Sequence, residues 1–372
     1  MLPMHKYDIG FLGGGQLARM SIQAAQRMGL KCLVLDPSPE CPAAQIADNL
    51  QGAIEYPESI AKLLGQCKRV TLENEFIPGL SLRTVQEEDG RSDALLPSWW
   101  TLTQINDKLV QRAQFASLGV PSPIALPIEA ETADTLADRV GFPMVIKSRF
   151  GGYDGKGTRT IRTKADLEGS RNLWENGGWL AEQFVPFKRE LAVMVFRSQS
   201  EVGTFPTMET VQTGHVCDLV FPAQVDASGI AIEAVKAVDG FGLFGVELFE
   251  LEDGNFQVNE IAPRPHNTGH YTLDWGGVTQ FEQHVRLVMG WPCAKPQGFD
   301  TCMANLLGQS GAGDFKKGIA AAMDAVPSAQ IHWYGKQESR PGRKMGHINV
   351  VGQDCVELAQ IARASFYKGW TG

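Results

Sequence analysis

The sequence predicts a mixed α/β and α+β protein that begins with a doubly wound, Rossmann-like domain. Three observations predict this fold class. The chain has 372 residues, enough to bury more than one hydrophobic core. Strand and helix patterns alternate over roughly the first 100 residues, which is typical of a parallel sheet covered by helices. From residue 180 the pattern becomes strand-rich, which indicates an α+β arrangement.

Composition excludes several classes of protein. The net charge of −8 argues against a broad grip on nucleic acid or on an anionic membrane. No apolar run approaches the roughly 20 residues that span a bilayer, and the N-terminal residues lack the features of a signal peptide. The seven cysteines are odd in number and scattered, so we expect structural thiols rather than disulfides or a zinc site. We therefore expect a cytoplasmic protein with no nucleic-acid or membrane partner.

The N-terminal unit is predicted from its alternating elements. Strands are expected at residues 7–12, 31–36 and 69–72, with helices at 16–28 and 58–64 between them. Gly29 stands where the first helix would end. This pattern predicts parallel strands with helices packed on the sheet.

A first glycine motif lies between the first strand and the first helix. Gly13, Gly14, Gly15 and Ala18 fit the pattern GxGxx(G/A), and Asp36 closes the next strand. One interpretation is a dinucleotide site, which would make the chain a dehydrogenase. We favour a small anion at the helix N-terminus, because a better nucleotide site lies further along the chain.

The second unit is expected to open with one helix over residues 103–118, ended by Gly119 and Pro121. The strands at 144–147 and 158–162 then flank a second glycine motif.

This second motif, residues 151–157, holds four glycines and Lys156. It is not a Walker loop, because Gly157 follows the lysine and a strand, not a helix, comes next. A plain surface turn is the alternative, but such a turn rarely needs four glycines. We favour a lid whose backbone amides bind phosphates and whose closure excludes water. Lys147 ends an apolar strand and is placed to reach the phosphates, whereas Lys108 lies on the preceding helix and is a weaker candidate.

A hairpin in the strand-rich unit brings two acids together. A helix is expected at 228–239, followed by two strands joined at Asp253-Gly254. A two-residue turn there places Glu247 directly opposite Glu260. The same face would pair apolar residues, Phe249 with Val258 and Leu251 with Phe256, so we expect it to be the buried face.

Two carboxylates facing each other at the end of a buried face repel one another. A bound cation removes the conflict, and Mg²⁺ suits it because Mg²⁺ combines one or two carboxylates with nucleotide phosphates. A proton shared between the acids and a different hairpin register are the alternatives. We favour the metal.

After residue 296 the sequence predicts short strands and many turns. A basic cluster, Lys336, Arg340, Arg343 and Lys344, lies around a Pro-Gly turn in this otherwise acidic chain. Arginine donors suit a phosphate. A solvated basic face explains the cluster equally well from the residues alone.

Six stretches carry a resemblance to a known family: GFLGGGQLARM, TLENEF, VIKSRFGGYDGKGT, AEQFVPFKRELAV, VNEIAPRPHNTGHYT and HWYGKQESRPGRKMGHIN. With these motifs in this order the chain resembles the ATP-grasp ligases. More closely it is similar to the N5-carboxyaminoimidazole ribonucleotide synthetase family. The stretches are distributed from one end of the chain to the other.

The resemblance implies an activity and an architecture. The activity is ATP- and bicarbonate-dependent carboxylation of aminoimidazole ribonucleotide in purine biosynthesis, through carboxyphosphate, with Mg²⁺ and in a homodimer. A formate-dependent glycinamide ribonucleotide transformylase is the alternative within the superfamily. The architecture is a Rossmann-like preATP-grasp domain (1–100), a small lobe with the lid (101–179), a large lobe with the metal site (180–295) and a small C-terminal domain (296–372).

The resemblance also implies the residues that bind ATP. Phosphate contacts are implied for Lys108, Lys147 and the lid residues Gly152, Tyr153, Asp154, Gly155, Lys156 and Gly157. Contacts to adenine and ribose are implied for Glu182, Gln183, Phe184, Val185 and Glu190, with Gln212 and Asn259 completing the nucleotide set. Glu247 and Glu260 match the magnesium ligands. Many relatives carry an asparagine two residues after the second acid, where this chain has Ala262, so a third side-chain ligand is in doubt.

The acceptor site is implied to draw on all units. Gln16, Leu17, Glu75 and Asn267 match acceptor-contacting positions, and Lys336, Arg343 and Lys344 match contacts to the ribose phosphate. Tyr153 and Asp154 are candidates for contacting bicarbonate and the imidazole amine. With Lys336 and Arg343 they are the candidate catalytic residues.

Overall fold

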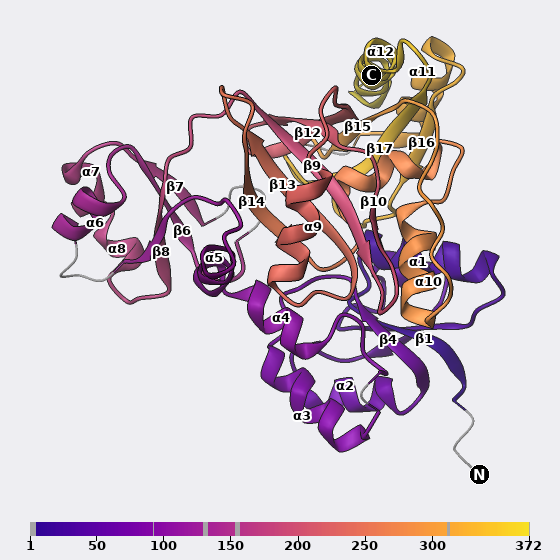
Figure 1. The fold of residues 1–372 in the computed structure, drawn as a ribbon. Helices are drawn as coiled ribbons and strands as arrows, with labels where there is room; N and C mark the ends of the chain where they lie inside the picture. Colours follow the sequence, from indigo (N-terminus) through magenta and orange to yellow (C-terminus); the bar gives the residue numbers. More distant parts are fainter. Residues whose placement is uncertain (1–4, 92, 129–132, 153–156, 311–312, 372) are drawn as a thin grey trace.

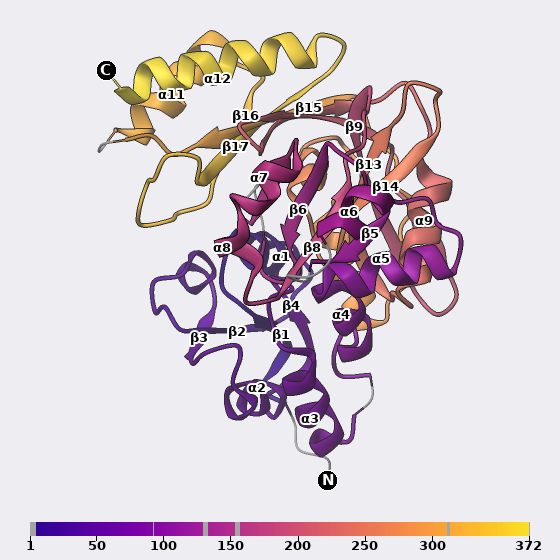
Figure 2. The same cartoon turned by 90° about the vertical axis from the view of Figure 1, so that its left-hand side faces the viewer.

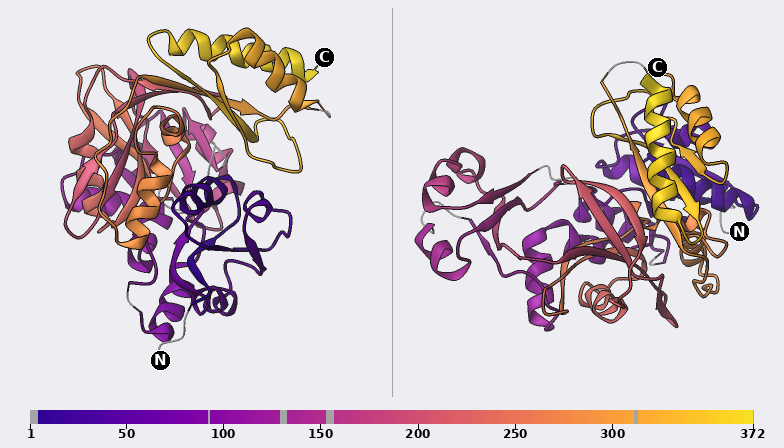
Figure 3. Two further views of the ribbon diagram at one scale, coloured as in Figure 1. Left: turned by 90° about the vertical axis from the view of Figure 1, so that its right-hand side faces the viewer. Right: turned by 90° about the horizontal axis from the view of Figure 1, so that it is seen from above.

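The computed structural model describes residues 5–91, 93–128, 133–152, 157–310 and 313–371. Figure 1 shows an N-terminal unit below a large central sheet, with the C-terminal helices above it and a small lobe projecting to one side. The view from above in Figure 3 shows how far the small lobe stands out from the rest. The predicted fold class is confirmed.

The N-terminal unit holds a parallel sheet, as predicted. Its strand order is β3-β2-β1-β4, in which β3 was not expected from the sequence. Its strands are β1 (Tyr7–Leu12), β2 (Cys32–Asp36), β3 (Asp48–Gln51) and β4 (Cys67–Leu72). Its helical elements are α1 (Gln16–Arg27), η1 (Pro42–Gln45), α2 (Pro57–Leu64) and α3 (Gly79–Asp89). Helix α1 ends before Gly29, whose φ of 79° suits a glycine after a helix C-terminus.

One face of this sheet is covered by a helix from another unit. Helix α10 (Gln280–Met289) lies beside α1, and its Val285 and Val288 join Ile9 and Ile22 in one core. The opposite face packs on α2 and α3. The N-terminal unit is therefore doubly wound, but one of its covering helices, α10, comes from a distant part of the chain.

The single helix predicted over residues 103–118 is wrong, because two helices occupy the range. They are α4 (Trp99–Asn106) and α5 (Lys108–Ser117). Asp107 stands between them in an extended conformation, and its carboxylate accepts a hydrogen bond from the backbone N–H of Leu109. An aspartate at this position begins a new helix, because its side chain satisfies a free N–H group of the first turn.

The small lobe is an antiparallel sheet in the order β5-β8-β6-β7, and Figure 2 shows this lobe in front. Its strands are β5 (Ala125–Pro127), β6 (Met144–Ser148), β7 (Thr158–Ile161) and β8 (Trp179–Gln183). Its helices are α6 (Ala133–Arg139), α7 (Lys164–Glu168) and α8 (Arg171–Trp174). The division at residue 179 differs from the structure, because β8 pairs with β5 and β6 and so belongs to the small lobe.

The large sheet has the order β14-β13-β9-β11-β12-β15-β17-β16, with β10 beside β9. The strands of its first part are β9 (Arg189–Arg197), β10 (Val202–Thr204), β11 (Met208–Thr213), β12 (Val216–Pro222), β13 (Gly242–Glu250) and β14 (Phe256–Ala262). Those of its second part are β15 (Thr301–Leu307), β16 (Gln330–Trp333) and β17 (Lys344–Val351). Since β12 pairs with β15, the large lobe and the C-terminal unit share one sheet.

Helices cover this sheet in two places. Helix α9 (Ser228–Ala237) and α5 pack on β9, β13 and β14, and the short η2 (Asn267–Leu273) follows β14. At the other end lie α11 (Phe315–Ala325) and α12 (Cys355–Thr371), which the sequence analysis missed. The buried face of α12 includes Ala359 and Ala362, and small residues give only a weak hydrophobic period.

The structure also bears on the expectations for membrane-spanning helices and for the cysteines. Within the described ranges, no helix is long and apolar enough to cross a bilayer. All seven cysteines are unpaired and six are buried. Burial raises the pKa of Cys32, Cys67, Cys217 and Cys302 to about 12, as expected for unreactive structural thiols.

Candidate active site

The structure confirms that Glu247 lies opposite Glu260, although the predicted turn between them is wrong. The turn has three residues, Glu252 to Gly254, since the backbone N–H of Leu251 donates to the carbonyl of Asn255 at 2.8 Å. A longer turn shifts the pairing by one residue. A register irregularity next to Glu247 then restores it, because Leu248 pairs with Val258 while Glu247 pairs with Glu260. Asn259 is thus the extra residue of a β-bulge.

The expectation that the two acids share the buried apolar face is wrong for the same reason. The core side chains of β13 are Val246 and Leu248, which pack under α9. Glu247 is half-buried on the opposite face, which it shares with Phe249. The Phe249 ring stacks on Phe187 at 4.6 Å between centroids. Glu250 is buried and paired with Lys188 and Arg189.

Lys108 is placed against the second acid. Because α5 begins at Lys108, this residue is held at the helix N-terminus, and its Nζ lies 2.8 Å from Glu260 Oε1. Burial tends to raise the pKa of Glu260, but Lys108, Lys147 and Arg112 together outweigh burial and the pKa is lowered. Glu260 keeps an exposed side-chain fraction of 42%. Lys108, the weaker of the two lysine candidates, therefore directly contacts Glu260, one of the two acids predicted to bind magnesium.

Lys147 lies at the end of β6, where its Nζ is 2.6 Å from Glu182 Oε2 and 3.5 Å from Asn259 Oδ1. Glu182 also accepts a hydrogen bond from Arg112 Nε at 2.8 Å. Burial opposes ionisation of Glu182, yet Arg112 and Lys147 together lower its pKa from 4.5 to about 2. The stabilisation from this contact is present above pH 4.5 and is lost as the pH falls toward 2. The Glu182 side chain, expected at adenine, instead lies buried between two cations.

The segment after Glu182 joins the lobes as expected. Strand β8 ends at Gln183 and β9 begins at Arg189, so residues 184–188 lead from the small-lobe sheet to the large one. Phe184 is exposed and Val185 is buried. Glu190 follows in β9, and Gln212 of β11 donates a hydrogen bond to it. Burial raises the pKa of Glu190, and the amide of Gln212 partly opposes that rise.

The structure describes both ends of the second glycine motif, residues 151–152 and 157. Gly151 and Gly157 have φ values of 70° and 72°, a conformation that favours glycine. Ser148 N–H donates to the carbonyl of Gly157 at 2.7 Å, which closes the base of the loop between β6 and β7. Tyr153, Asp154, Gly155 and Lys156 lie outside the described residues.

Two backbone N–H groups of the first glycine motif donate hydrogen bonds to carboxylates of the chain itself. Gly14 N–H donates to Asp36 Oδ2 at 2.8 Å, and Leu17 N–H donates to Glu73 Oε1 at 3.4 Å. A Cβ atom on Gly15 would lie 2.2 Å from Glu73 Oε1, so a larger residue there would have to displace the Glu73 side chain. Asp36 therefore braces the turn rather than facing a ribose, which removes the basis for the dehydrogenase interpretation. Glu73 takes the position expected for a small anion, and burial raises its pKa.

The predicted acceptor residues of the N-terminal unit lie beside this turn. Gln16 begins α1 and is half-buried, whereas the Leu17 side chain is buried in a core with Tyr334. Glu75 forms a bidentate pair with Arg264, whose Nη2 donates to Glu75 Oε1 at 2.8 Å. Arg264 follows β14, so this pair joins the N-terminal unit to the strand that carries Glu260.

The other residues predicted to bind the acceptor lie in η2 and around the turn between β16 and β17. Asn267 is buried and exchanges two hydrogen bonds with Asn305, at 3.0 and 2.7 Å. Lys336 donates to the carbonyl of Lys344 at 2.6 Å, and Arg343 to the carbonyl of Glu338 at 2.8 Å. Arg340 pairs with Glu338 at the exposed surface.

Electrostatic influence links these groups. Burial raises the pKa of Glu73, and the charges of Arg264 and Lys336 partly oppose that rise. Burial lowers the pKa of His266, and the charges of Arg264 and Lys344 lower it further. His266 Nε2 is 3.7 Å from Glu247 Oε1, and its lowered pKa keeps the imidazole neutral. The C-terminal lysines, the N-terminal acids and the carboxylate pair therefore belong to one region.

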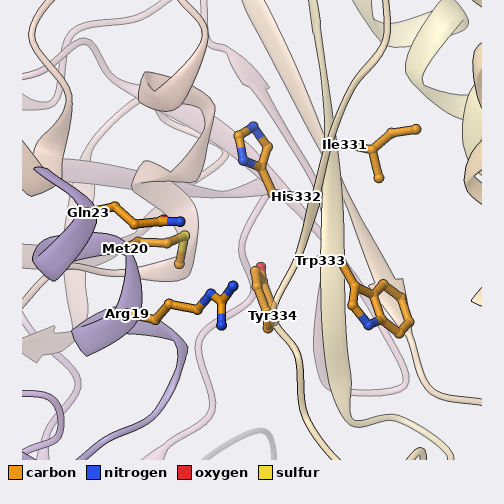
Figure 4. Close-up of a pocket in the computed structure, with 7 residues that line it drawn as sticks. All are labelled: Arg19, Met20, Gln23, Ile331, His332, Trp333 and Tyr334. Carbon is orange, nitrogen blue, oxygen red and sulfur yellow. The ribbon is translucent and has the colours of Figure 1, made fainter. Parts of the chain in front are cut away.

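A separate cavity of about 190 Å³ lies between α1 and β16 (Figure 4). Its lining consists of Arg19, Met20, Gln23, Ile331, His332, Trp333 and Tyr334. None of the residues predicted for the nucleotide or acceptor sites lines it. His332 Nε2 lies 2.7 Å from Asp274 Oδ2. Because its walls come from α1 and from β16 with Tyr334, the cavity is part of the contact between the first and last units.

Three residues of the region were missed by sequence reasoning: Arg112, Arg264 and His266. Arg264 and His266 fall inside the quoted stretch VNEIAPRPHNTGHYT, so their proximity to Glu260 was an available signal. Arg112 had none, because an arginine one turn after Lys108 on a helix is usually solvated.

Comparison with known proteins covers most of the chain. Three family profiles match: a ribonucleotide synthetase preATP-grasp domain at residues 4–98, an ATP-grasp domain at 113–281, and a phosphoribosylaminoimidazole carboxylase C-terminal domain at 301–361. An N5-carboxyaminoimidazole ribonucleotide synthase of Synechococcus elongatus is 40% identical, over 95% of this chain and 92% of that protein.

Solved structures agree in fold. The carboxyaminoimidazole ribonucleotide synthase of Aspergillus clavatus complexed with ATP has a TM-score of 0.88 and 31% identity, over 98% of this chain and 99% of that one. A structure of the Aspergillus clavatus synthase with ADP and 5-aminoimidazole ribonucleotide has a TM-score of 0.89 and 30% identity, over the same shares.

The Glu75–Arg264 pair generates a stability prediction. Replacing Glu75 by glutamine leaves Arg264 buried without its counter-charge, so the free energy of unfolding should fall by about 3–5 kcal/mol. Urea denaturation measures the loss. The matched control is Glu87→Gln, which removes the exposed Arg83–Glu87 pair and should cost under about 0.5 kcal/mol. Equal small effects would show that the Glu75 contact does not hold the units together.

Proposed function

The chain belongs to the N5-carboxyaminoimidazole ribonucleotide synthase family of ATP-grasp enzymes, and from that premise we propose that it carboxylates 5-aminoimidazole ribonucleotide with ATP and bicarbonate. The observation that carries the proposal is the arrangement of Glu247 opposite Glu260 with Lys108 and Lys147 beside them. Two acids and two lysines at the contact between two lobes suit a nucleoside triphosphate with its bound Mg²⁺.

The reaction has two steps. A bicarbonate oxygen attacks the γ-phosphorus of ATP, the bond to the β-phosphate oxygen breaks, and carboxyphosphate and ADP form. The exocyclic amine of the acceptor then forms a bond to the carboxyl carbon, phosphate leaves, and the nitrogen gives up a proton. Lys108 and Lys147 stabilise the negative charge that develops on the transferring phosphoryl group.

Magnesium fits the donor set that the chain provides. Glu247 and Glu260 lie directly opposite on neighbouring strands, and neutral His266 beside Glu247 adds no positive charge there. Within the described ranges no group of three or more His, Cys, Asp or Glu could hold a metal ion, so phosphates and water would complete the coordination. When bound, Mg²⁺ neutralises charge on the β- and γ-phosphates.

The lid, residues 151–157, covers the phosphates and keeps water from carboxyphosphate in this proposal. Its amides face the phosphates, and Tyr153 and Asp154 contact bicarbonate and the imidazole amine. Support comes from the antiparallel pairing of β6 with β7, which makes the segment a hairpin loop next to Lys147.

The nucleoside end of ATP is assigned to the segment between the lobes. Gln183, Phe184 and Val185 flank adenine, and Glu190 accepts hydrogen bonds from the ribose hydroxyls, with Gln212 fixing Glu190. Asn259 lies beside the phosphates, next to Lys147. In this proposal Glu182 does not contact the nucleotide but holds the ammonium group of Lys147 in place.

The acceptor is assigned to the side of the region bounded by the first and last units. Lys336, Arg343 and Lys344 bind its phosphate, with Gln16 and the backbone of Leu17 nearby. Glu75 and Asn267 act by holding Arg264 and Asn305 in place. The positive charge of Lys336 opposes the rise in the pKa of Glu73, and that of Lys344 contributes to the lowered pKa of His266. Both effects support this placement of the acceptor.

We further propose a cytoplasmic homodimer. Seven unpaired cysteines support a reducing compartment. The dimer rests on the family resemblance.

The substrate dependence of ADP release tests the function. We expect ADP formation to require Mg²⁺ and bicarbonate and to rise when aminoimidazole ribonucleotide is added. A coupled assay for ADP measures it. Release that responds to formate and glycinamide ribonucleotide instead would overturn the carboxylase assignment in favour of a transformylase.

Glu260→Gln tests the metal assignment. Turnover should fall by about 100-fold or more, because the neutral amide cannot hold Mg²⁺ against the phosphates. The variant should stay folded at the assay temperature, although loss of the Lys108–Glu260 pair lowers its thermal midpoint. Glu252→Gln, the same change in the exposed turn of the same hairpin, should leave turnover unchanged. Near-normal activity of Glu260→Gln would refute the assignment.

Arg343→Ala tests the acceptor phosphate site. The KM for aminoimidazole ribonucleotide should rise by about 10- to 100-fold, the loss expected for one charge-assisted hydrogen bond, while the KM for ATP changes little. Arg340→Ala is the control, because Arg340 is 69% exposed and paired with Glu338. Equal changes in both KM values would count against the site.

A further inference from the structure

Arg112 lies buried where the two lobes meet. Its side chain extends from α5 and is 5% exposed. Nε donates to Glu182 Oε1 of β8 at 2.8 Å, and Nη2 donates to the carbonyl of Asn259 in β14 at 2.6 Å. One guanidinium thus holds the last small-lobe strand and the bulge next to Glu260. Neither the predicted site nor the proposed function uses it.

The charges around Glu182 do not cancel. Its two carboxylate oxygens are divided between two cations, Oε1 with Arg112 and Oε2 with Lys147. The carboxylate is 2% exposed, and its pKa of about 2 keeps it ionised at neutral pH. Two positive charges against one negative charge leave the group with a net charge of +1. Without Arg112, Lys147 and Glu182 would form a neutral pair.

We propose that Arg112 is a positioning residue that keeps the Lys147–Glu182 group of the nucleotide site positively charged. Because Arg112 neutralises the negative charge of Glu182, the positive charge of Lys147 remains available to phosphates. By its second bond Arg112 holds the bulge that carries Asn259 beside Lys147. The inference rests on the proposed function only in assigning the phosphates of ATP to Lys147.

Burial explains why a residue that does not touch phosphate affects its binding. Charges interact more strongly in a site of low effective dielectric than in water. A neutral Lys147–Glu182 pair would attract phosphate far less than a group of charge +1. An arginine suits this position, because its planar guanidinium stays charged and donates to two acceptors at once.

Nucleotide binding by charge-altered variants tests the role. The affinity for Mg·ADP, measured by titration calorimetry without bicarbonate or acceptor, should fall by about tenfold or more in Arg112→Gln. The double variant Arg112→Gln/Glu182→Gln restores the charge of +1, so its affinity should return to within about threefold of the unsubstituted chain. Arg112→Lys, which keeps the charge, should also stay within about threefold.

Salt dependence separates charge from mere packing. The affinity of the unsubstituted chain and of the double variant should fall more steeply with ionic strength than that of Arg112→Gln. Arg363→Gln is the matched control, because it removes a part-buried ion pair with Asp218 in the C-terminal unit. It should leave nucleotide affinity unchanged.

The outcomes are distinguishable. If Arg112→Gln binds within about twofold of the unsubstituted chain, or if the double variant binds no better than the single one, the inference is overturned while the proposed function stands. If Arg112→Gln does not fold, Arg112→Lys and the double variant decide, and a tenfold loss in either overturns it. If the unsubstituted chain does not bind Mg·ADP, the proposed function itself fails, and the inference with it.

Discussion

Charges from different parts of the chain compensate one another in the space between the lobes. Glu260 of the large sheet is paired with Lys108 of α5, and Glu182 of the small lobe is paired with Arg112 of the same helix. Arg264, just after β14, is paired with Glu75 of the N-terminal unit. Uncompensated charges at such positions would be costly, so each pair also fixes how two units lie against each other. The site and the arrangement of the units therefore depend on the same contacts.

Helix α5 illustrates this dependence. Asp107 ends α4, caps α5 and pairs with Arg149, two residues before the second glycine motif. The break between the helices sets Lys108 at the helix N-terminus, one turn before Arg112. Both cations then face acids of the two lobes, Lys108 toward β14 and Arg112 toward β8. A continuous helix through residue 107 would lack this cap.

The bulge at Asn259 has a comparable effect on the large sheet. It changes the pairing of β13 and β14 by one residue just before the acids, so Glu247 and Glu260 lie opposite each other despite the three-residue turn. It also makes the Asn259 carbonyl available to Arg112 and its amide oxygen available to Lys147. A bulge re-aims side chains in this way because one strand carries an extra residue that the ladder does not pair.

The sequence by itself determined the features that follow from local pattern. Alternation of strands and helices indicated the parallel N-terminal sheet, and the short turn between two apolar strands indicated the hairpin with its facing acids. The motifs GGYDGKG and NEIAPRPHNTGH together indicated the family. The tertiary structure decided what depends on contacts between distant segments. Examples are the break at Asp107, the sheet shared through β12 and β15, and the filling of the first glycine turn by Asp36 and Glu73. Arg112 could not be identified from its neighbours in the chain, because its function comes from Glu182, 70 residues later, and from Asn259, 147 residues later. Local pattern specifies which face of an element is buried, whereas a buried charge is understood only from the partner that the fold brings to it.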